Sequence, residues 1–273
     1  MSIKLGIDIG GSTTKIIGLR NGKLIGTKQV RAADQVTALF GAIGSFLREF
    51  NASLEDVSDI ALTGVGASFV GNESLYGIKT YKVNEFQAIG HGARYLSGLH
   101  NILVVSMGTG TAIVKATGTE IVRIGGSGVG GGTILGLASL MLQKRDIDAI
   151  IAMALDGDLN NIDLMVSDIV GEEIPSLPSD LTAANFGNVK STASNSDIAL
   201  GIINMVFEVI GMLSVFAIKN EPINDVVLTG TLATFPQAGV VFSRFSDMTG
   251  LNFTIPDNAV FATALGTVFT EFT

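Results

Sequence analysis

Two glycine- and hydroxyl-rich segments carry the residue types best suited to bind phosphate. Glycine lets backbone N–H groups approach phosphate oxygens closely, hydroxyls add donors, and a nearby lysine adds positive charge. The first segment consists of Gly10, Gly11, Ser12, Thr13, Thr14 and Lys15, and the second of Gly108, Thr109, Gly110 and Thr111. Either one alone is also typical of a tight turn. Because the pattern occurs twice, we predict two facing loops that hold a polyphosphate.

A carboxylate precedes the first of these loops. Asp8 is separated from Gly10 by a single residue. Magnesium prefers oxygen ligands and keeps several of its waters when it binds a protein. An aspartate at this position is also common as a turn-stabilising residue. We predict that Asp8 holds Mg²⁺ through water.

A third glycine cluster, residues 123–133, leads into a predicted helix. The free N–H groups and the dipole at a helix N-terminus favour phosphate. The cluster is therefore a third candidate phosphate-binding segment.

The same cluster offers an alternative, a dinucleotide-binding dehydrogenase. Gly126, Gly128 and Gly131 match the G-x-G-x-x-G fingerprint, and Asp146 lies about twenty residues further on, as that fingerprint requires. We rank this alternative second, because the fingerprint opens a βαβ unit, whereas here it follows three predicted strands in hairpin order. The P-loop pattern G-x-x-x-x-G-K-[ST] does not occur in the sequence.

Phosphoryl transfer also requires a catalytic base and a positive charge. The base orients or deprotonates the acceptor hydroxyl, and the charge stabilises the transferred phosphoryl group. Glu85, at the start of a predicted helix, is the candidate for the first role, and Arg123 for the second. Without the glycine loops, both side chains would be interpreted as ordinary ion-paired or solvated groups.

The spacing of apolar residues predicts the elements that position these groups. A β-rich run, a small-residue turn and a second β-rich run occur at 5–19 and again at 102–114, which indicates two related lobes. Further strands are predicted at 23–30, 59–62, 120–124 and 225–230, and helices at 34–50, 84–96, from about 132, near Ala233 and at 258–272. We predict an α/β fold with lobes at residues 1–100 and 101–273 and a cleft between them.

Composition excludes several classes of protein. Apolar residues make up 47% of the chain and charged residues 15%, which predicts a folded core. The net charge is −8 and the basic residues are scattered, so a nucleic-acid partner is not expected. The chain has no cysteine, which excludes disulfides, thiolate nucleophiles and cysteine-ligated metal sites. The apolar start is too short for a secretory signal, and we expect a cytoplasmic protein.

One segment, residues 198–218, is apolar enough to raise the question of a membrane span. Glu208 interrupts it, and a charge is costly in lipid. Flanking basic residues are lacking except for Lys219. We interpret the segment as a buried core or dimer-interface helix, and we expect no membrane contact.

In their order along the chain, these motifs resemble those of the type II pantothenate kinases. The matching segments are residues 6–15, 84–86, 108–111, 123–133 and 180–188. The last, which begins at Asp180 and reads DLTAANFGN, is the most distinctive because it has no general phosphate-binding explanation. The first loop departs from many relatives at Ser12-Thr13, and Gln87 stands where some relatives carry an acid.

The resemblance implies a duplicated actin-like (ribonuclease H-like) fold with an ATP cleft between its lobes. It further implies Mg²⁺ and ATP as cofactors, pantothenate as acceptor and a homodimer built through helices of the second lobe, and it leaves open whether pantetheine is accepted. By resemblance, Glu85 is the catalytic base and Arg123 holds substrate and developing charge. The implied nucleotide contacts are residues 8–15, Gly108, Thr109, 131–133 and Thr231.

Other proteins of the same fold are the remaining alternatives. ATP-driven activators of radical dehydratases carry cysteines for an iron–sulfur cluster, which this chain lacks. Small-sugar kinases usually use an aspartate as base, where this sequence has Glu85. Another small-molecule kinase or an ATP-binding regulatory protein stays open from the sequence.

Overall fold

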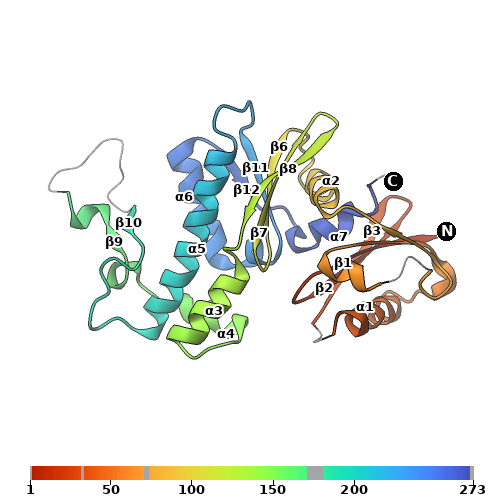
Figure 1. The fold of residues 1–273 in the computed structure, drawn as a ribbon, viewed down its shortest axis with the longest axis horizontal. Coiled ribbons are helices and arrows are strands. Elements are labelled where there is room, and N and C mark those ends of the chain that lie inside the picture. The colour runs from red at the N-terminus through yellow and green to blue at the C-terminus, as the bar shows by residue number, and fades with distance from the viewer. Residues whose placement is uncertain (1, 32–33, 71–73, 171–180, 271–273) are drawn as a thin grey trace.

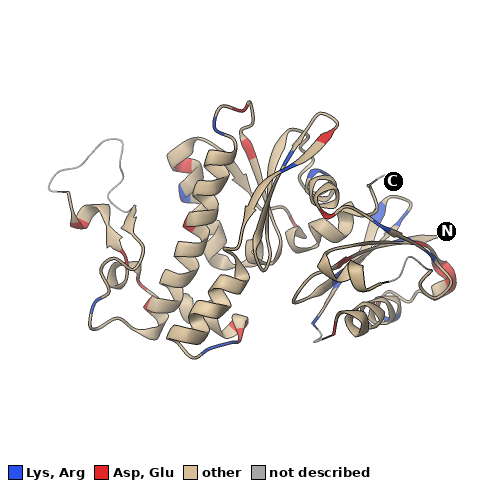
Figure 2. Ribbon diagram, viewed as in Figure 1, with Lys and Arg blue, Asp and Glu red and all other residues tan. Residues whose placement is uncertain are grey.

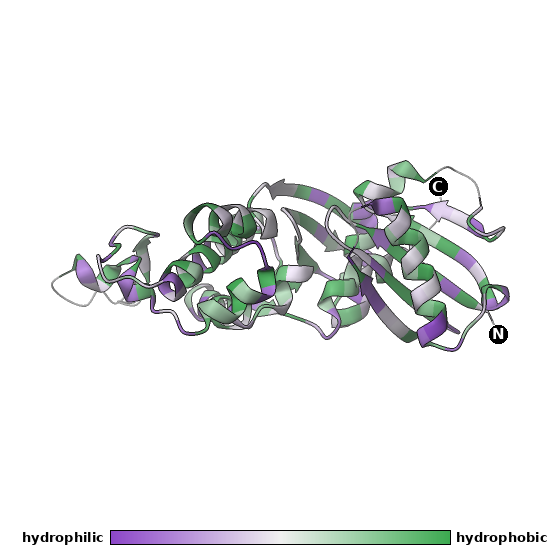
Figure 3. Ribbon diagram, turned by 90° about the horizontal axis from the view of Figure 1, so that it is seen from below, coloured by the Kyte–Doolittle hydropathy of each residue, from purple (hydrophilic) through white to green (hydrophobic). Residues whose placement is uncertain are grey.

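The computed structural model describes residues 2–31, 34–70, 74–170 and 181–270. The molecule is elongated, with two lobes arranged one after the other along its long axis (Figures 1 and 3). In the view of Figure 2, acidic and basic residues are distributed over both lobes, as expected from their scatter along the sequence.

The first lobe is built on a five-stranded sheet with the order β3-β2-β1-β4-β5. Strands β1 (Ile3–Ile9), β2 (Thr14–Arg20) and β3 (Lys23–Val30) form an antiparallel meander, whereas β4 (Val57–Thr63) and β5 (Lys79–Lys82) run parallel to β1. One face of the sheet packs against α1 (Gln35–Glu49).

The second lobe repeats this arrangement, in the order β12-β11-β6-β7-β8. Strands β6 (Ile102–Met107), β7 (Thr111–Thr117) and β8 (Glu120–Ser127) form the meander, and β11 (Asp225–Thr229) and β12 (Asn252–Thr254) are parallel to β6. The outer face is covered by α3 (Gly131–Met141), α4 (Ile147–Ala154), α5 (Asn195–Ala217) and α6 (Pro236–Thr249). The duplicated fold expected from the sequence is therefore confirmed.

Two helices lie between the sheets, and each covers the sheet of the other half of the chain. Helix α2 (Glu85–Ser97), which follows the first sheet in sequence, packs against β6, β7 and β8. Helix α7 (Ala262–Gly266), near the end of the described chain, covers Ile17 and Leu19 of β2. The layers are thus α1, first sheet, α7 with α2, second sheet, and the outer helices (Figure 1).

Helices α2 and α7 cross at two glycines. A Cβ atom at Gly92 would overlap the carbonyl oxygen of Ala262 and lie 2.6 Å from its carbonyl carbon. A Cβ atom at Gly266 would do the same to the carbonyl of Ala88. The two backbones are therefore in direct contact, which only glycine allows, and this contact joins the lobes.

Several predicted elements differ from those observed. The helix predicted at 258–272 is only α7, preceded by the 3₁₀ turn η6 (Ala259–Phe261). The helix predicted to begin near Ala233 is α6, which begins at Pro236 after the short 3₁₀ helix η5 (Thr231–Thr234). Strands β5 and β12 were not predicted because both are short edge strands. The dinucleotide fold is wrong, because β8 is antiparallel to β7 and opens no βαβ unit.

Helix α5 is the one helix of the described residues that is long and apolar enough to cross a bilayer, and 56% of its most apolar window is buried within the fold. Ile202, Val206 and Ile210 pack in the core of the second lobe. The carboxylate of Glu208, in the middle of the helix, accepts hydrogen bonds from the side chains of Thr182 (2.8 Å) and Asn185 (2.7 Å). These contacts agree with its interpretation as a core helix.

Candidate active site

A cleft of about 700 Å³ lies between the lobes. It is bounded by the loops that join β1 to β2 and β6 to β7, by the N-termini of α2 and α3, and by η5. The predicted site residues that line it are Asp8, Gly10, Gly11, Ser12, Thr13, Lys15, Glu85, Gly108, Thr109, Gly131, Gly132 and Thr231. The fold thus brings together groups that are far apart in the sequence.

The two predicted phosphate loops face each other across this cleft. The hydroxyls of Ser12 and Thr109 lie 3.5 Å apart. Each loop is closed by a backbone hydrogen bond, from Gly10 N to the Thr13 carbonyl (3.0 Å) and from Gly108 N to the Gly110 carbonyl (2.8 Å). No acceptor within the described residues pairs with the N–H groups of Gly11, Ser12, Thr109 and Gly110. These donors can therefore bind phosphate oxygens.

The N-terminus of α3 supports the second loop. The N–H groups of Gly131 and Gly132 donate to the carbonyls of Gly108 and Thr109, each at 2.9 Å. The Thr133 hydroxyl donates to the Gly128 carbonyl (3.1 Å) and does not line the cleft. The N–H groups of Gly131 and Gly132 are therefore paired with carbonyls of the second loop, whereas the direct phosphate contacts predicted for this helix N-terminus require free N–H groups.

Three charged groups, Asp8, Lys15 and Glu85, share one end of the cleft. Asp8 Oδ2 lies 3.5 Å from Lys15 Nζ, and both side chains are buried. Burial raises the pKa of Asp8, and the positive charge of Lys15 offsets part of that rise. Burial also raises the pKa of Glu85, the charge of Asp8 raises it further, and Lys15 lowers it. Two carboxylates face one ammonium group, so the end of the cleft has an excess of negative charge.

A cation fits this arrangement. The described residues contain no cluster of three or more groups able to ligate a metal. Mg²⁺ bound to a nucleotide needs only one or two carboxylates, since phosphates and waters complete its shell. Asp8, with its excess negative surroundings, matches that requirement.

The backbone that carries Glu85 is fixed by its neighbours. It is the first residue of α2, whose N-cap Asn84 accepts hydrogen bonds from Phe86 N (2.9 Å) and Gln87 N (3.2 Å). The Gln87 amide donates to the Ile121 carbonyl of β8 at 2.8 Å. The helix start, and with it the backbone of Glu85, is therefore tied to the second sheet.

Arg123 and Thr14 lie outside the cleft lining. Arg123 is on β8, and its guanidinium stacks over the ring of Phe86, 5.2 Å from the centroid. Arg123 therefore contacts the residue that follows Glu85, although its guanidinium does not border the cleft. Thr14 is buried in β2, where it is paired with Ile9.

Sequence reasoning missed the apolar part of the cleft. One wall is formed by Leu135, Ile147, Leu232 and Phe235, which come from α3, α4 and the segment around η5. Arg31 and Arg145 border it as well, and Arg31 lies 3.6 Å from Asp148 across the lobes. These residues carry no local motif, because apolar side chains at a helix start look like ordinary core.

Of the distinctive motif at 180–188, Asp180 lies outside the described residues. The described residues of this motif donate hydrogen bonds to two carboxylates, those of Asp163 and Glu208. Phe186 N donates to Asp163 Oδ1 (2.8 Å), whose other oxygen accepts from Asn204 of α5 (3.2 Å). Burial raises the pKa of Asp163. Together with the bonds to Glu208, this network fastens the protruding segment that carries β9 (Leu164–Met165) and β10 (Thr182–Ala184) to α5.

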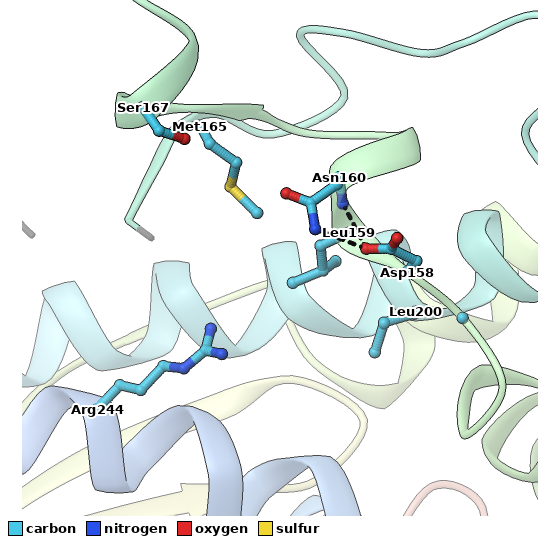
Figure 4. Close-up of a pocket in the computed structure, with 8 residues that line it drawn as sticks. Asp158, Leu159, Asn160, Met165, Ser167, Leu200 and Arg244 are labelled. Atoms are coloured by element: carbon cyan, nitrogen blue, oxygen red, sulfur yellow. Dashed lines mark hydrogen bonds between the residues drawn. The ribbon is translucent and has the colours of Figure 1, made fainter. Parts of the chain in front are cut away.

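A second pocket, of about 380 Å³, lies beside this segment (Figure 4). Arg244 of α6 points into it, opposite Met165 and Asn160, whose amide is bonded to Asp158 (2.8 Å). None of the predicted site residues lines this pocket.

Comparisons with known proteins agree with the geometry. The family model described as Fumble matches residues 40–238. A type II pantothenate kinase from Oceanobacillus iheyensis is 31% identical, with 98% of this chain and 99% of the relative covered. One from Bacillus cereus (strain G9842) is 29% identical, with 90% of each chain covered.

Two solved structures share the fold. An activator of 2-hydroxyisocaproyl-CoA dehydratase from Clostridium difficile, with bound ADPNP, has a TM-score of 0.69 at 15% identity and covers 97% of this chain and 92% of its own. Component A of (R)-2-hydroxyglutaryl-CoA dehydratase from Acidaminococcus fermentans has a TM-score of 0.70 at 19% identity, with coverages of 98% and 96%. At this identity the likeness concerns the fold alone.

Proposed function

We propose, from the premise that this chain belongs to the type II pantothenate kinase family, that it transfers the γ-phosphoryl group of ATP to pantothenate. The product is 4′-phosphopantothenate, and the reaction is the first step of coenzyme A synthesis. The observation that carries the proposal is that both glycine loops and the Asp8–Lys15–Glu85 cluster lie in one cleft.

The triphosphate of ATP lies between the two loops. The N–H groups of Gly11, Ser12, Thr109 and Gly110 bind its oxygens, and Lys15 neutralises part of its charge. The apolar wall beyond η5 suits the adenine ring, with Thr231 beside it. When bound, Mg²⁺ supplies charge neutralisation at the phosphates, and Asp8 holds it through water.

Glu85 is the general base. It takes the proton of the acceptor hydroxyl as the oxygen attacks the γ-phosphorus, and the bond to the bridging oxygen breaks to release ADP. Its raised pKa supports this role, because a base near the working pH accepts a proton most effectively. Arg123 stacks on Phe86, the residue after Glu85, with its guanidinium outside the cleft lining, so its proposed role requires the side chain to turn into the cleft when substrate binds, where its charge acts on the acceptor and on the developing negative charge.

The remaining proposals concern architecture. The lobes comprise residues 1–100 and 101–273, and two copies pair through the outer helices. Exposed apolar side chains on α5, Val209, Met212 and Phe216, follow one helical face and support a homodimer. We also propose a cytoplasmic location, where ATP is abundant; whether pantetheine is accepted besides pantothenate is left to the assay below.

The test is a mass-spectrometric assay of purified protein with Mg-ATP and pantothenate, with pantetheine and glucose as parallel acceptors. We expect phosphopantothenate from the wild type and none from Glu85→Gln, which keeps the shape of the side chain and removes the base. No product from any acceptor, with ATP still bound, would refute the proposed reaction.

A further inference from the structure

The turn that follows β4 in the first lobe repeats the turn that follows β11 in the second. Residues 59–69 read DIALTGVGASF, and residues 225–235 read DVVLTGTLATF, so six of eleven positions are identical. Both strands run parallel to the central strand of their sheet, and both lead into a 3₁₀ helix, η2 (Val65–Phe69) and η5. The two turns are equivalent positions of a duplicated unit.

The backbones of the two turns are alike. Gly64 has φ 88° and ψ 167°, and Gly230 has φ 88° and ψ 179°. A Cβ atom at Gly64 would lie 2.6 Å from Asp8 Oδ1 and from the Ile9 carbonyl oxygen, and one at Gly230 would lie 2.5 Å from the Met107 carbonyl oxygen. Each glycine therefore lets its 3₁₀ helix approach the end of the strand that carries a phosphate loop.

The residue after each glycine lines the cleft, but the two differ in chemistry. Thr231, from the second lobe, is polar, and Val65, its equivalent from the first lobe, is apolar. Val65 is 62% exposed, although its side chain is apolar, whereas Ile60 and Leu62 of the strand that leads into its turn are fully buried. An apolar side chain held open to a cleft favours a ligand with a hydrocarbon surface at that point.

Val65 lies at the catalytic end of the cleft. Its neighbour Gly64 touches Asp8, and Thr63 donates to the carbonyl of Val83 at 2.9 Å, two residues before Glu85. An acceptor whose hydroxyl reaches Glu85 therefore brings the carbon next to that hydroxyl towards Val65. In pantothenate the phosphorylated hydroxymethyl group is attached to a carbon that carries two methyl groups.

We propose that Val65 is a specificity-determining residue, which packs against the two methyl groups beside the phosphorylated hydroxyl. This inference rests on the proposed function. It predicts that the first-lobe copy of the repeated turn reads the acceptor, while the second-lobe copy reads the nucleotide.

The experiment combines two proteins with two acceptors. Wild type and Val65→Thr are assayed with pantothenate and with the analogue that lacks both methyl groups. We expect the wild type to prefer pantothenate roughly tenfold or more in kcat/KM, since a hydrocarbon contact in a pocket contributes about that factor. Val65→Thr should lose most of this preference, with the KM for ATP unchanged.

Three controls make the outcome decisive. Thr231→Val, the change at the equivalent position, should raise the KM for ATP and keep the preference between acceptors. Val189→Thr, at an exposed valine outside the cleft, should alter neither, and Val65→Ala should lower the preference as Val65→Thr does. If the wild type phosphorylates pantothenate but Val65→Thr keeps its preference, the inference is wrong while the function stands. If the wild type forms no phosphopantothenate, both fail.

Discussion

The glycine contact between α2 and α7 gives the sharpest test of the fold. In Gly92→Ala the new Cβ must leave a position 2.6 Å from the Ala262 carbonyl carbon and in overlap with its oxygen. Ordinary carbon–carbon contacts need about 3.5 Å or more, so the two helices must separate by roughly 1 Å. Backbone cannot yield as a flexible side chain can. We expect a cost at the upper end of the overpacking range, about 3 kcal/mol.

For a protein of this size that cost corresponds to a fall in Tm of roughly 6–10 °C, measurable by differential scanning fluorimetry or circular dichroism. The matched control is Gly41→Ala in α1, where an added Cβ meets nothing within 4 Å. There the higher helix propensity of alanine should raise stability by about 0.5–1 kcal/mol.

Activity should follow the same pattern. Glu85 is the first residue of α2, so a shift of this helix moves the carboxylate relative to Lys15 and should lower kcat. Gly266→Ala should reproduce the effect, and the double variant should cost less than the sum, because either substitution alone already separates the helices. Equal Tm values for Gly92→Ala and Gly41→Ala would show that the two backbones are not in contact.

Further predictions concern single side chains. Glu85→Gln should abolish turnover yet raise Tm at neutral pH. Folding raises the pKa of this carboxyl, so its ionised form destabilises the fold at neutral pH and its protonated form does not. The gain in Tm should therefore vanish below about pH 4.5, and a gain independent of pH would contradict the reasoning. Asp197→Ala should lower the free energy of unfolding in urea by about 3 kcal/mol, because this carboxylate accepts hydrogen bonds from Ser194 N and Asp158 N. Its lowered pKa makes the loss largest above about pH 4. Equal wild-type and variant stability at pH 7 would refute this. Phe216→Asp should convert the proposed dimer to a monomer in light scattering, whereas Val36→Asp on α1 should not; an unchanged mass would place the interface elsewhere.

Repetition made much of the fold predictable from sequence. The two strand–turn–strand openings differ in length and composition from a βαβ unit, and so pointed to duplicated lobes. The capped start of α2 at Asn84 was also readable, because an N-cap residue followed by apolar periodicity marks a helix. The repeat of 59–69 at 225–235 was equally present in the sequence, and it is the signal that would have found Val65.

Long-range packing was not readable. Nothing local marks Gly92 and Gly266 as partners, since they are 174 positions apart and each looks like an unfavourable helix residue. The functions predicted for Gly131 and Gly132 depended on free N–H groups, and whether those groups are free depends on carbonyls of a distant loop. Arg123 was predicted at the cleft, but the ring of Phe86, from another element, decides where its guanidinium rests.

The packing of α2 and α7, each on the sheet of the other half of the chain, also bears on how the protein folds during synthesis. During synthesis the first sheet leaves the ribosome early, but the helix that covers Ile17 and Leu19 is translated only after the strands of the second sheet. Until then one face of that sheet stays exposed, and α2 must wait for β6 to β8. The first lobe can therefore complete its packing only after α7, which follows every strand of the second sheet in the chain, so vectorial folding of lobe one before lobe two is not open to this protein.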